Sequence, residues 1–366
     1  MTKAHDIRHM ARALQLAARG LYTCDPNPRV GCVLVKGGTV IGEGWHVRAG
    51  EPHAEVLALR AAGEAVCGAT AYVSLEPCGH HGRTPPCAEA LIAAGVSRVV
   101  TAMEDPNPQV AGRGLQMLRE AGIATETGLL QSQAEALNPG FIKRMRTGHP
   151  LVRCKLAMSL DGRTAMASGE SQWITGSAAR ADVHRLRARS SALLTGVGTV
   201  LADDPSLNVR LDTDEPVQQP LRVVLDSQLR MPTDARMLSL PGRTLVCCVE
   251  GADVEKVAML TGVGAEVHCL PVEKNGHVSL PALLDFLVGE SVNEVMVEAG
   301  AILNGALLQA GLVDEVIVYL APLLVGDAAR GLFHLPGLEK MAQRIELKIV
   351  DMRAVGDDWR ITAHLF

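Results

Sequence analysis

Short apolar runs alternate with helical patterns along almost the whole chain, and this alternation constrains the fold more than any other feature. In the first half, runs rich in β-branched residues are each followed by a segment whose apolar residues recur at helical spacing. Such an order predicts an α/β sheet with helices on its faces. We expect strands within 29–47 (a hairpin turning at Gly37-Gly38), 69–77, 97–106 and 123–130, and helices within 1–20, 53–63, 85–95, 112–122 and 131–148.

The alternation is interrupted by a basic segment that ends in His149-Pro150, and it restarts at Leu151. A chain of 366 residues is too long for one typical hydrophobic core. We therefore predict two α/β domains, residues 1–147 and 148–366, joined near 144–151. In the second domain we expect a basic helix at 177–190, a strand and a turn in 191–210, a strand-to-helix unit in 292–311, and further strands in 151–162, 220–227, 243–250, 265–272, 314–326, 346–355 and 359–366.

The composition argues against several classes of protein. A formal net charge of −5 and an aromatic content of 3% disfavour a nucleic-acid binder, which needs a basic face or stacking aromatics. No apolar run approaches the roughly 18–20 residues that span a bilayer, and charged residues interrupt the N-terminal pattern where a secretion signal would be apolar. The nine scattered cysteines make a poor disulfide framework. We expect a cytoplasmic protein with reduced thiols and with neither a nucleic-acid nor a membrane partner.

Two separated segments carry residues that suit a metal ion. The first is HAE at 53–55, and the second is EPCGHHGRTPPC at 76–87. Together they offer His53, Cys78 and Cys87, one imidazole and two thiolates, which suit tetrahedral Zn²⁺. Because three protein ligands leave the fourth position open for water, the set predicts a catalytic zinc site.

Glu55 follows the histidine by two residues and has a role of its own in this hypothesis. It need not bind the metal, and it can face the water as a general acid/base that passes a proton to a departing amine. Zinc deaminases divide the work in this way, although their two cysteines are two residues apart rather than eight. A structural zinc site with His80 as the fourth ligand is the alternative, and it would leave Glu55 without a function.

These stretches resemble the deaminase half of the bifunctional riboflavin-biosynthesis deaminase/reductase family. NPRVGCVLV from Asn27, a GEGWH stretch ending at His46 and EDPNPQVAGRG from Glu104 add to the resemblance. The resemblance implies a cytidine-deaminase-like N-terminal domain. It also implies substrate contacts from Asn27, His46, His80, Arg83, Asp105 and Asn107. Asn27 and Asn107 each precede a proline in ordinary turn signals, so a purely local role stays open for both.

Two glycine turns of the second half have no decisive pattern of their own. GVGTVL at 196–201 lacks the third glycine of a dinucleotide-binding fingerprint. EAGAILNG at 298–305 lies between a strand and a helix, where backbone amides can hold a phosphate. Small residues would serve a plain connection there equally well.

Four stretches of the second half resemble the reductase half of the same family: KLAMSLDGRTA from Lys155, SQWITG from Ser171, GVGTVLADDPSLNVR from Gly196 and EAGAILNG from Glu298. The resemblance implies a dihydrofolate-reductase-like α/β domain that binds NADPH. The implied cofactor contacts are Ala157, Trp173, Thr199, Asp203, Ser227, Gly300, Ala301, Ile302, Leu303, Asn304, Gly305 and Ala306. The implied substrate contacts are Ser171, Arg187, Leu207, Arg210 and Glu298.

Some of these residues invite a chemical reason of their own. The guanidinium groups of Arg187 and Arg210 suit a phosphate held in a bidentate manner. Lys155 and Asp203 are candidates for protonating the sugar while hydride arrives at carbon. Asp203 equally fits a loop or cap position beside its acidic neighbour, and Trp173 equally fits the core.

The resemblance implies a two-step enzyme. It would hydrolyse an amino group from 2,5-diamino-6-(5-phosphoribosylamino)pyrimidin-4-one with Zn²⁺, then reduce the ribosyl group to ribityl with NADPH. We expect this phosphorylated pyrimidine to be its small-molecule partner and the chain to form a homo-oligomer, a dimer or a tetramer. Two alternatives stay open: a zinc nucleobase or tRNA-adenosine deaminase fused to an unrelated reductase, and a zinc-stabilised RNA-binding regulator.

Overall fold

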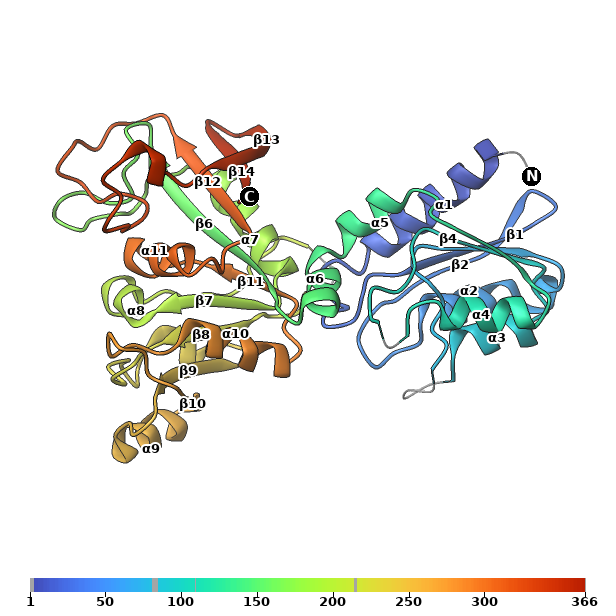
Figure 1. Ribbon diagram of the computed structural model, residues 1–366, viewed down its shortest axis with the longest axis horizontal. Helices are drawn as coiled ribbons and strands as arrows, with labels where there is room; N and C mark the ends of the chain where they lie inside the picture. Colours follow the sequence, from blue (N-terminus) through green and yellow to red (C-terminus); the bar gives the residue numbers. More distant parts are fainter. Residues whose placement is uncertain (1–2, 81–84, 109, 214–215, 366) are drawn as a thin grey trace. The chain divides into compact units, whose positions relative to one another are not determined.

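The computed structural model describes residues 3–80, 85–108, 110–213 and 216–365. The chain divides into two compact units, Met1–His149 and Pro150–Phe366. Each unit has its own sheet and its own helices (Figure 1). The linking segment lies between a helix that ends at Thr147 and a strand that begins at Leu151.

In the described part of the N-terminal unit, five strands form one sheet: β1 Gly31–Lys36, β2 Thr39–Trp45, β3 Thr70–Val73, β4 Arg98–Thr101 and β5 Ala124–Thr127. Their order is β2-β1-β3-β4-β5. β1 pairs antiparallel with β2 and with β3, whereas β3, β4 and β5 run parallel. Gly37 and Gly38 make the β1–β2 turn with φ values of 58° and 83°, which residues with a Cβ rarely adopt.

Helices cover both faces of this sheet: α1 Lys3–Ala18, α2 Ala54–Ala62, α3 Cys87–Ala93, α4 Arg113–Glu120, α5 Gln131–Leu137 and α6 Pro139–Thr147, with a 3₁₀ turn η1 at Gly63–Val66. α1, α5 and α6 pack on one face around Met10, Tyr72 and Ile142. α2, α3 and α4 pack on the other face around Ala58 and Leu91. The sheet is therefore the middle layer of three, as the alternation predicts.

Nine strands form the sheet in the described part of the C-terminal unit: β6 Leu151–Ser159, β7 Ala192–Gly196, β8 Leu221–Leu225, β9 Thr244–Val249, β10 Glu266–Leu270, β11 Glu294–Val297, β12 Glu315–Ala321, β13 Leu347–Val355 and β14 Asp358–Leu365. The order is β10-β9-β8-β7-β11-β6-β12-β14-β13. The strands from β10 to β12 in this order run parallel, and β14 and β13 are antiparallel additions. The sheet is thus mixed.

Helices also cover both faces of the second sheet: α7 Ser177–Arg189, α8 Val197–Asp203, α9 Val254–Gly262, α10 Leu280–Gly289 and α11 Ala301–Gln309, with 3₁₀ turns η2 at Arg236–Ser239 and η3 at Met341–Gln343. α10 and α11 pack on one face and α7, α8 and α9 on the other. The short parallel strands are almost wholly apolar because both of their faces are covered.

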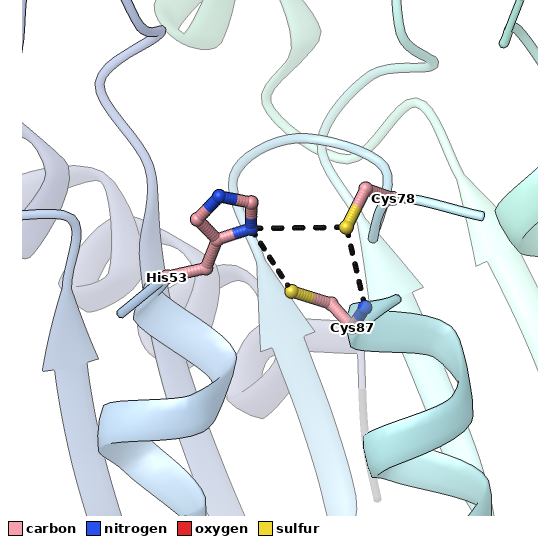
Figure 2. Close-up of side chains that lie close together, drawn as sticks. All are labelled: His53, Cys78 and Cys87. Atoms are coloured by element: carbon pink, nitrogen blue, oxygen red, sulfur yellow. Dashed lines mark hydrogen bonds between the residues drawn. The ribbon is translucent and has the colours of Figure 1, made fainter. Parts of the chain in front are cut away.

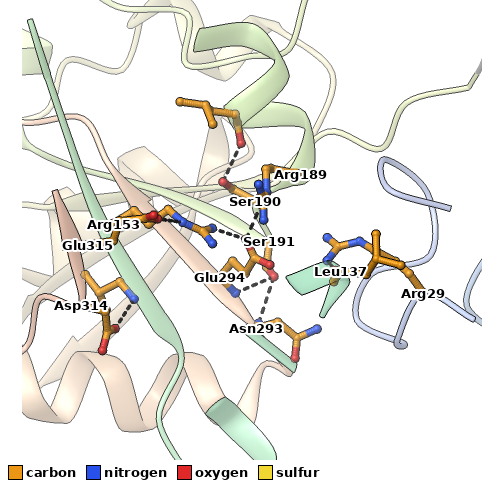
Figure 3. Close-up of polar contacts among 12 residues, drawn as sticks. Arg29, Leu137, Arg153, Arg189, Ser190, Ser191, Asn293, Glu294, Asp314 and Glu315 are labelled. Atoms are coloured by element: carbon orange, nitrogen blue, oxygen red, sulfur yellow. Dashed lines mark hydrogen bonds and ion pairs between the residues drawn. The ribbon is translucent and has the colours of Figure 1, made fainter. Parts of the chain in front are cut away.

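A buried ion cluster ties three neighbouring strands of this sheet together (Figure 3). Arg153 on β6 donates to Glu294 on β11 and to Glu315 on β12. Arg189, at the end of α7, lies 3.6 Å from the same Glu294 carboxylate. Two guanidinium groups and two carboxylates leave no net charge in the cluster, which is the condition for tolerating buried ions.

The α/β fold class predicted from the sequence is confirmed, but several elements differ from expectation. The helix expected over 131–148 is two helices, because Pro139 has no N–H to continue α5 and instead begins α6. The segment 191–210, expected as a strand and a turn, also contains helix α8. The helices α9 and α10 were not predicted at all. Within the residues described, no helix is both long and apolar enough to cross a membrane.

Candidate active sites

The predicted metal ligands converge at the junctions of strands and helices in the N-terminal unit (Figure 2). His53 precedes the first residue of α2, Cys87 begins α3, and Cys78 lies in the segment after β3. The Nδ1 atom of His53 lies 3.2 Å from the Cys87 sulfur and 3.7 Å from the Cys78 sulfur. The three ligand atoms all lie within 4.8 Å of one another.

These separations fit a tetrahedral zinc ion. Zn–N bonds of about 2.05 Å and Zn–S bonds of about 2.3 Å give a nitrogen-to-sulfur edge of roughly 3.6 Å. The two observed edges, 3.2 and 3.7 Å, lie close to that value. The donor set and its spacing therefore suit Zn²⁺.

The two cysteine thiols differ in their electrostatics. Hydrogen bonding with Cys87 lowers the pKa of Cys78 to about 4, against the effect of its burial. The same contact, together with burial, raises the pKa of Cys87. The Cys87 backbone N–H also donates to the Cys78 sulfur at 3.2 Å, which stabilises negative charge there. Without a metal, one thiolate is thus already favoured.

Glu55 lies beside this group and is 3% exposed. Burial and the charge of Cys78 raise its pKa to about 7, close to the pH at which a proton shuttle works best. His80, the fourth ligand of the alternative structural site, is exposed and does not belong to the ligand group found among the described residues. This geometry favours the catalytic interpretation over the structural one.

His46 and Asn27 lie at the same site. The His46 ring meets the His53 ring edge-on at 5.3 Å between centroids. Its Nδ1 lies 3.3 Å from the Pro52 carbonyl oxygen and its Nε2 lies 3.0 Å from Asn27 Nδ2. If Nδ1 donates to the carbonyl, Nε2 accepts from the asparagine amide, and this network assigns the tautomer. Burial lowers the pKa of His46, which keeps the ring neutral.

The loop after β4 brings further predicted residues. Asp105 accepts a hydrogen bond from the Asn107 backbone N–H at 2.8 Å, and burial raises the pKa of Asp105. Asn107 therefore lies in the turn that its sequence predicts, because its backbone N–H closes that turn onto the Asp105 side chain. Arg83 lies outside the described residues.

Glu76 is a residue of this site that the sequence analysis missed. Its Oε2 accepts from the N–H groups of Asp105 (3.0 Å) and Gly112 (2.9 Å), and its Oε1 from those of Gly114 (2.9 Å) and Leu115 (3.3 Å). One carboxylate thus fixes both the Asp105 loop and the start of α4 next to the segment that carries Cys78. The contact needs glycine, because a Cβ at Gly114 would lie 1.8 Å from the Pro77 oxygen.

The C-terminal unit contains a cavity of about 1810 Å³. Drug-sized pockets measure roughly 300–1000 Å³, so this cavity has room for two ligands at once. Its walls come from segments after β6, β7, β8 and β11, as expected where strands end and helices begin. The predicted residues that line it are Lys155, Ala157, Ser171, Trp173, Arg187, Thr199, Asp203, Leu207, Arg210, Ser227, Glu298, Gly300, Ala301, Ile302, Leu303 and Ala306.

Asn304 and Gly305 do not line this cavity. Asn304 is fully buried, and its side-chain amide donates to the Ala299 carbonyl at 2.8 Å. A Cβ at Gly305 would lie 2.0 Å from the His334 carbonyl oxygen, so this glycine permits close packing. The suggestion that Trp173 belongs to the core is wrong: its side chain is 69% exposed at the cavity, and the Arg180 guanidinium lies 4.8 Å from its ring centroid.

Charged residues of the cavity wall form a network around Glu298. Arg187 Nε and Nη2 donate to its two oxygens at 2.5 and 3.0 Å, and Lys155 Nζ lies 3.9 Å away. Although burial opposes ionisation, the charges of Arg187 and Lys155 lower the pKa of Glu298 to about 2. Burial lowers the pKa of Lys155, which makes its proton easier to transfer.

Arg210 and Arg187 differ in their surroundings. Arg187 Nη1 also donates to the Asn208 carbonyl at 3.1 Å, so each of its nitrogens has an acceptor. Arg210 is exposed, and its Nη1 donates to the Asn208 side chain at 2.5 Å. Its backbone N–H donates to His184 Nδ1 at 3.2 Å. His184 also lines the cavity, and the sequence analysis missed it.

Two features define a class: a His-Cys-Cys metal group with a buried glutamate, and a large cavity at strand ends of a separate α/β unit. Together they describe an enzyme that joins a zinc-dependent deaminase site to a second domain with its own ligand cavity. Comparison with protein families agrees. Residues 3–103 match the cytidine and deoxycytidylate deaminase zinc-binding region, and residues 150–361 match the RibD C-terminal domain.

Relatives along the full length give the particular family. The riboflavin biosynthesis protein RibD of Escherichia coli K12 is 56% identical over 363 residues, covering 96% of this chain and 97% of that one. The solved structure of Acinetobacter baumannii RibD (form 1) superposes with a TM-score of 0.92 at 49% identity, with 99% of each chain covered. A Thermotoga maritima diaminohydroxyphosphoribosylaminopyrimidine deaminase/5-amino-6-(5-phosphoribosylamino)uracil reductase gives 0.87 at 32% identity, again over 99% of each chain. The chain belongs to the RibD family of bifunctional riboflavin-biosynthesis enzymes.

Proposed function

We propose that residues 1–147 carry the deaminase and residues 148–366 the reductase of a two-step enzyme. The chain acts in riboflavin biosynthesis on a small phosphorylated pyrimidine, 2,5-diamino-6-(5-phosphoribosylamino)pyrimidin-4-one. It removes one amino group by hydrolysis and then reduces the ribosyl group of the product to ribityl. The observation that supports this most strongly is the convergence of His53, Cys78 and Cys87 beside the buried Glu55.

In the deaminase, His53 Nδ1 and the sulfurs of Cys78 and Cys87 would hold a zinc ion. When bound, the zinc would supply a Lewis acid that makes the attacking water more acidic. Glu55 accepts the proton of the attacking water and delivers it to the departing amine nitrogen. Its burial supports this role, because a carboxylate with a pKa near 7 can both accept and return a proton at neutral pH.

The substrate of the deaminase is held around this centre. His46 and Asn27 bind the pyrimidine, and their mutual contact supports a fixed orientation for both side chains. Asp105 and Asn107 also bind the substrate, from the loop that Glu76 holds in place. The remaining proposed contacts are His80 and Arg83, of which the arginine suits the phosphate.

In the reductase, the residues that line the large cavity hold NADPH and the sugar phosphate side by side. NADPH supplies the hydride. Thr199, Asp203, Ser227 and the turn that begins α11 bind the cofactor, while Ser171, Leu207 and Arg210 bind the substrate. The cavity volume supports simultaneous binding of both.

Lys155 is the proposed proton donor of the reductase, in preference to Asp203. Asp203 is exposed at the end of α8, whereas Lys155 is largely buried with a lowered pKa. Glu298 and Arg187 orient Lys155 through the charged network around Glu298. As hydride adds to C1 of the sugar, the bond between C1 and the ring oxygen breaks, and the proton goes to that oxygen or to the amine nitrogen attached to C1.

The chain also forms a homo-oligomer, a dimer or a tetramer, and a second copy covers the strand β13. β13 is an edge strand, and its side chains at Ile349, Val350 and Met352 are 60%, 45% and 54% exposed. Exposed edges with apolar side chains are normally covered in a native assembly. Ile349→Lys should lower the mass measured by light scattering, whereas Lys348→Gln on the same strand should not. An unchanged mass in Ile349→Lys would exclude this face.

The protein works in the cytoplasm. Its nine cysteines are all free, including Cys67 and Cys269 on the surface, which suits a reducing compartment.

Metal analysis together with two activity assays tests the proposed function. Purified protein given the diaminopyrimidine phosphate and NADPH should hold one zinc per chain, release one ammonia per substrate and consume one NADPH. Ammonia release without NADPH consumption would remove the reductase assignment. Protein without bound zinc that still deaminates would remove the metal assignment.

A further inference from the structure

A pair of cysteines lies far from the zinc ligands in sequence and is not used by either proposed reaction. Cys248 on β9 and Cys269 on β10 are register partners on adjacent parallel strands. Their sulfur atoms lie 3.3 Å apart. Because β10 is the edge strand of the sheet, this pair is at its border.

The two thiols have different access to solvent. Cys269 is exposed, whereas Cys248 is fully buried in the cluster under α9. Burial and the contact with Cys269 raise the pKa of Cys248 to about 12, so this thiol is protonated at neutral pH. An exposed cysteine beside a second, protected thiol is the arrangement of redox-sensitive pairs, in which one sulfur is attacked first and the other resolves it.

We propose that Cys248 and Cys269 form a reversible disulfide bond with each other. The oxidant is a low-molecular-weight disulfide such as oxidised glutathione, which reacts by thiol–disulfide exchange. The Cys269 sulfur gives up its proton and attacks one glutathione sulfur; the glutathione S–S bond breaks and one glutathione thiol leaves. The Cys248 sulfur then attacks the Cys269 sulfur, the bond between Cys269 and glutathione breaks, and the Cys248 proton passes to the departing glutathione sulfur, which leaves as the second thiol. Two protein thiols are oxidised, and one glutathione disulfide is reduced to two thiols.

The disulfide restrains a segment that lines the reductase cavity. A disulfide bond of about 2.05 Å requires the two sulfurs to approach by about 1.3 Å. β10 ends at Leu270, the residue after Cys269. After two more residues the chain reaches the cavity wall, which includes Glu273, Asn275, Gly276, His277 and Val278. The Val278 N–H donates to Ser227 Oγ at 3.2 Å, so movement of this segment reaches a proposed NADPH contact. This second step rests on the proposed function of Ser227.

The test uses the full-length, zinc-loaded chain incubated in buffers of defined oxidised and reduced glutathione. Mass spectrometry should show the loss of two hydrogen atoms and a peptide that joins Cys248 to Cys269, both reversed by dithiothreitol. The Cys248→Ala variant should stop at a glutathione adduct on Cys269. Cys67→Ser, which removes an exposed cysteine of the other unit, should behave like the unchanged chain. A stable glutathione adduct on Cys269 in the unchanged chain, or no reaction at either thiol, would overturn the proposal.

NADPH binding, followed by its fluorescence, tests the consequence separately. The oxidised chain should bind NADPH roughly fivefold more weakly, the low end of ordinary coupling between sites. Cys269→Ser, at an exposed position, should show no change under the same oxidation. If the joined peptide forms and NADPH affinity stays the same, the disulfide stands and its link to the cavity is rejected. If the unoxidised chain fails to bind NADPH, the proposed reductase function is at fault instead.

Discussion

Glu76 is the most informative single position for the deaminase, because one buried carboxylate accepts four backbone N–H groups. Replacing it by glutamine keeps the size and removes the charge. One amide oxygen can serve only one pair of donors, so the other pair then faces an NH₂ group. Either the Asp105 and Gly112 amides or the Gly114 and Leu115 amides lose their acceptor.

The size of the effect follows from these contacts. A hydrogen bond to a charged group contributes about 1.5–3 kcal/mol, so losing two costs roughly 3–6 kcal/mol. A typical domain is stable by about 5–15 kcal/mol, so Glu76→Gln should fold with reduced stability. At about 3 kcal/mol, the melting temperature of the deaminase unit should fall by roughly 10 °C. The loop that holds Asp105 should loosen with it.

Calorimetry and the two activity assays together check this reasoning. Glu76→Gln should raise KM for the pyrimidine in the deaminase assay while zinc content and reductase activity stay the same. Glu120→Gln is the matched control, since that exposed carboxylate accepts one hydrogen bond, from Gln116. A Glu76→Gln chain that melts and deaminates like the control would refute the claim that this carboxylate holds the loop. Loss of zinc would show that it supports the metal ligands instead.

Four further predictions concern both sites. Glu55→Gln should keep zinc and lose deamination by at least about a hundredfold, the ordinary worth of general acid/base catalysis; retained ammonia release would exclude the proton shuttle. Cys87→Ser should lower the zinc content measured by elemental analysis, and an unchanged content would reject it as a ligand. Arg210→Ala should raise KM for the sugar phosphate by roughly tenfold or more with little change for NADPH, as expected for a lost charged hydrogen bond, and the reverse pattern would assign it to the cofactor. Burial and the nearby arginines lower the pKa of His184 to about 4, below its unfolded value near 6.5; stability of the C-terminal unit should therefore fall as pH drops from about 6.5 to 4, and an equal fall in His184→Gln would contradict this.

The convergence of His53, Cys78 and Cys87 could be predicted because each belongs to a short motif at the start of a helix or just after a strand. The α/β class could be predicted because strands and helices alternate along the sequence, and both units show this alternation. Glu76 could not be predicted in the same way, although it stands two residues before Cys78. Its partners at 105 and 112–115 come from another strand end, and only the folded chain brings them to it.

The broken helix at 131–148 is a different kind of miss, because the signal was visible. Pro139 lies inside the expected helix, and a proline there ends one helix and can begin the next. α8 was not predicted, because Gly196, Gly198 and the acidic pair Asp203-Asp204 are residues typical of a turn. In the first case the prediction followed the helical spacing of apolar residues and overlooked the proline. In the second it followed the turn-forming residues and overlooked a short helix.

Arg187 and Arg210 show what the sequence leaves undecided even when both residues are found. Both are basic, both line the same cavity, and their residue type alone suits a phosphate equally well. In the folded chain, Arg187 donates two hydrogen bonds to the largely buried carboxylate of Glu298. Removing either partner would leave the other as a buried charge without compensation. Arg210 is exposed at the cavity and has only a neighbouring asparagine side chain as its bonded acceptor among the contacts described. We therefore propose that Arg210 binds the phosphate and that Arg187 holds Glu298, and through it Lys155, in place for the proton transfer.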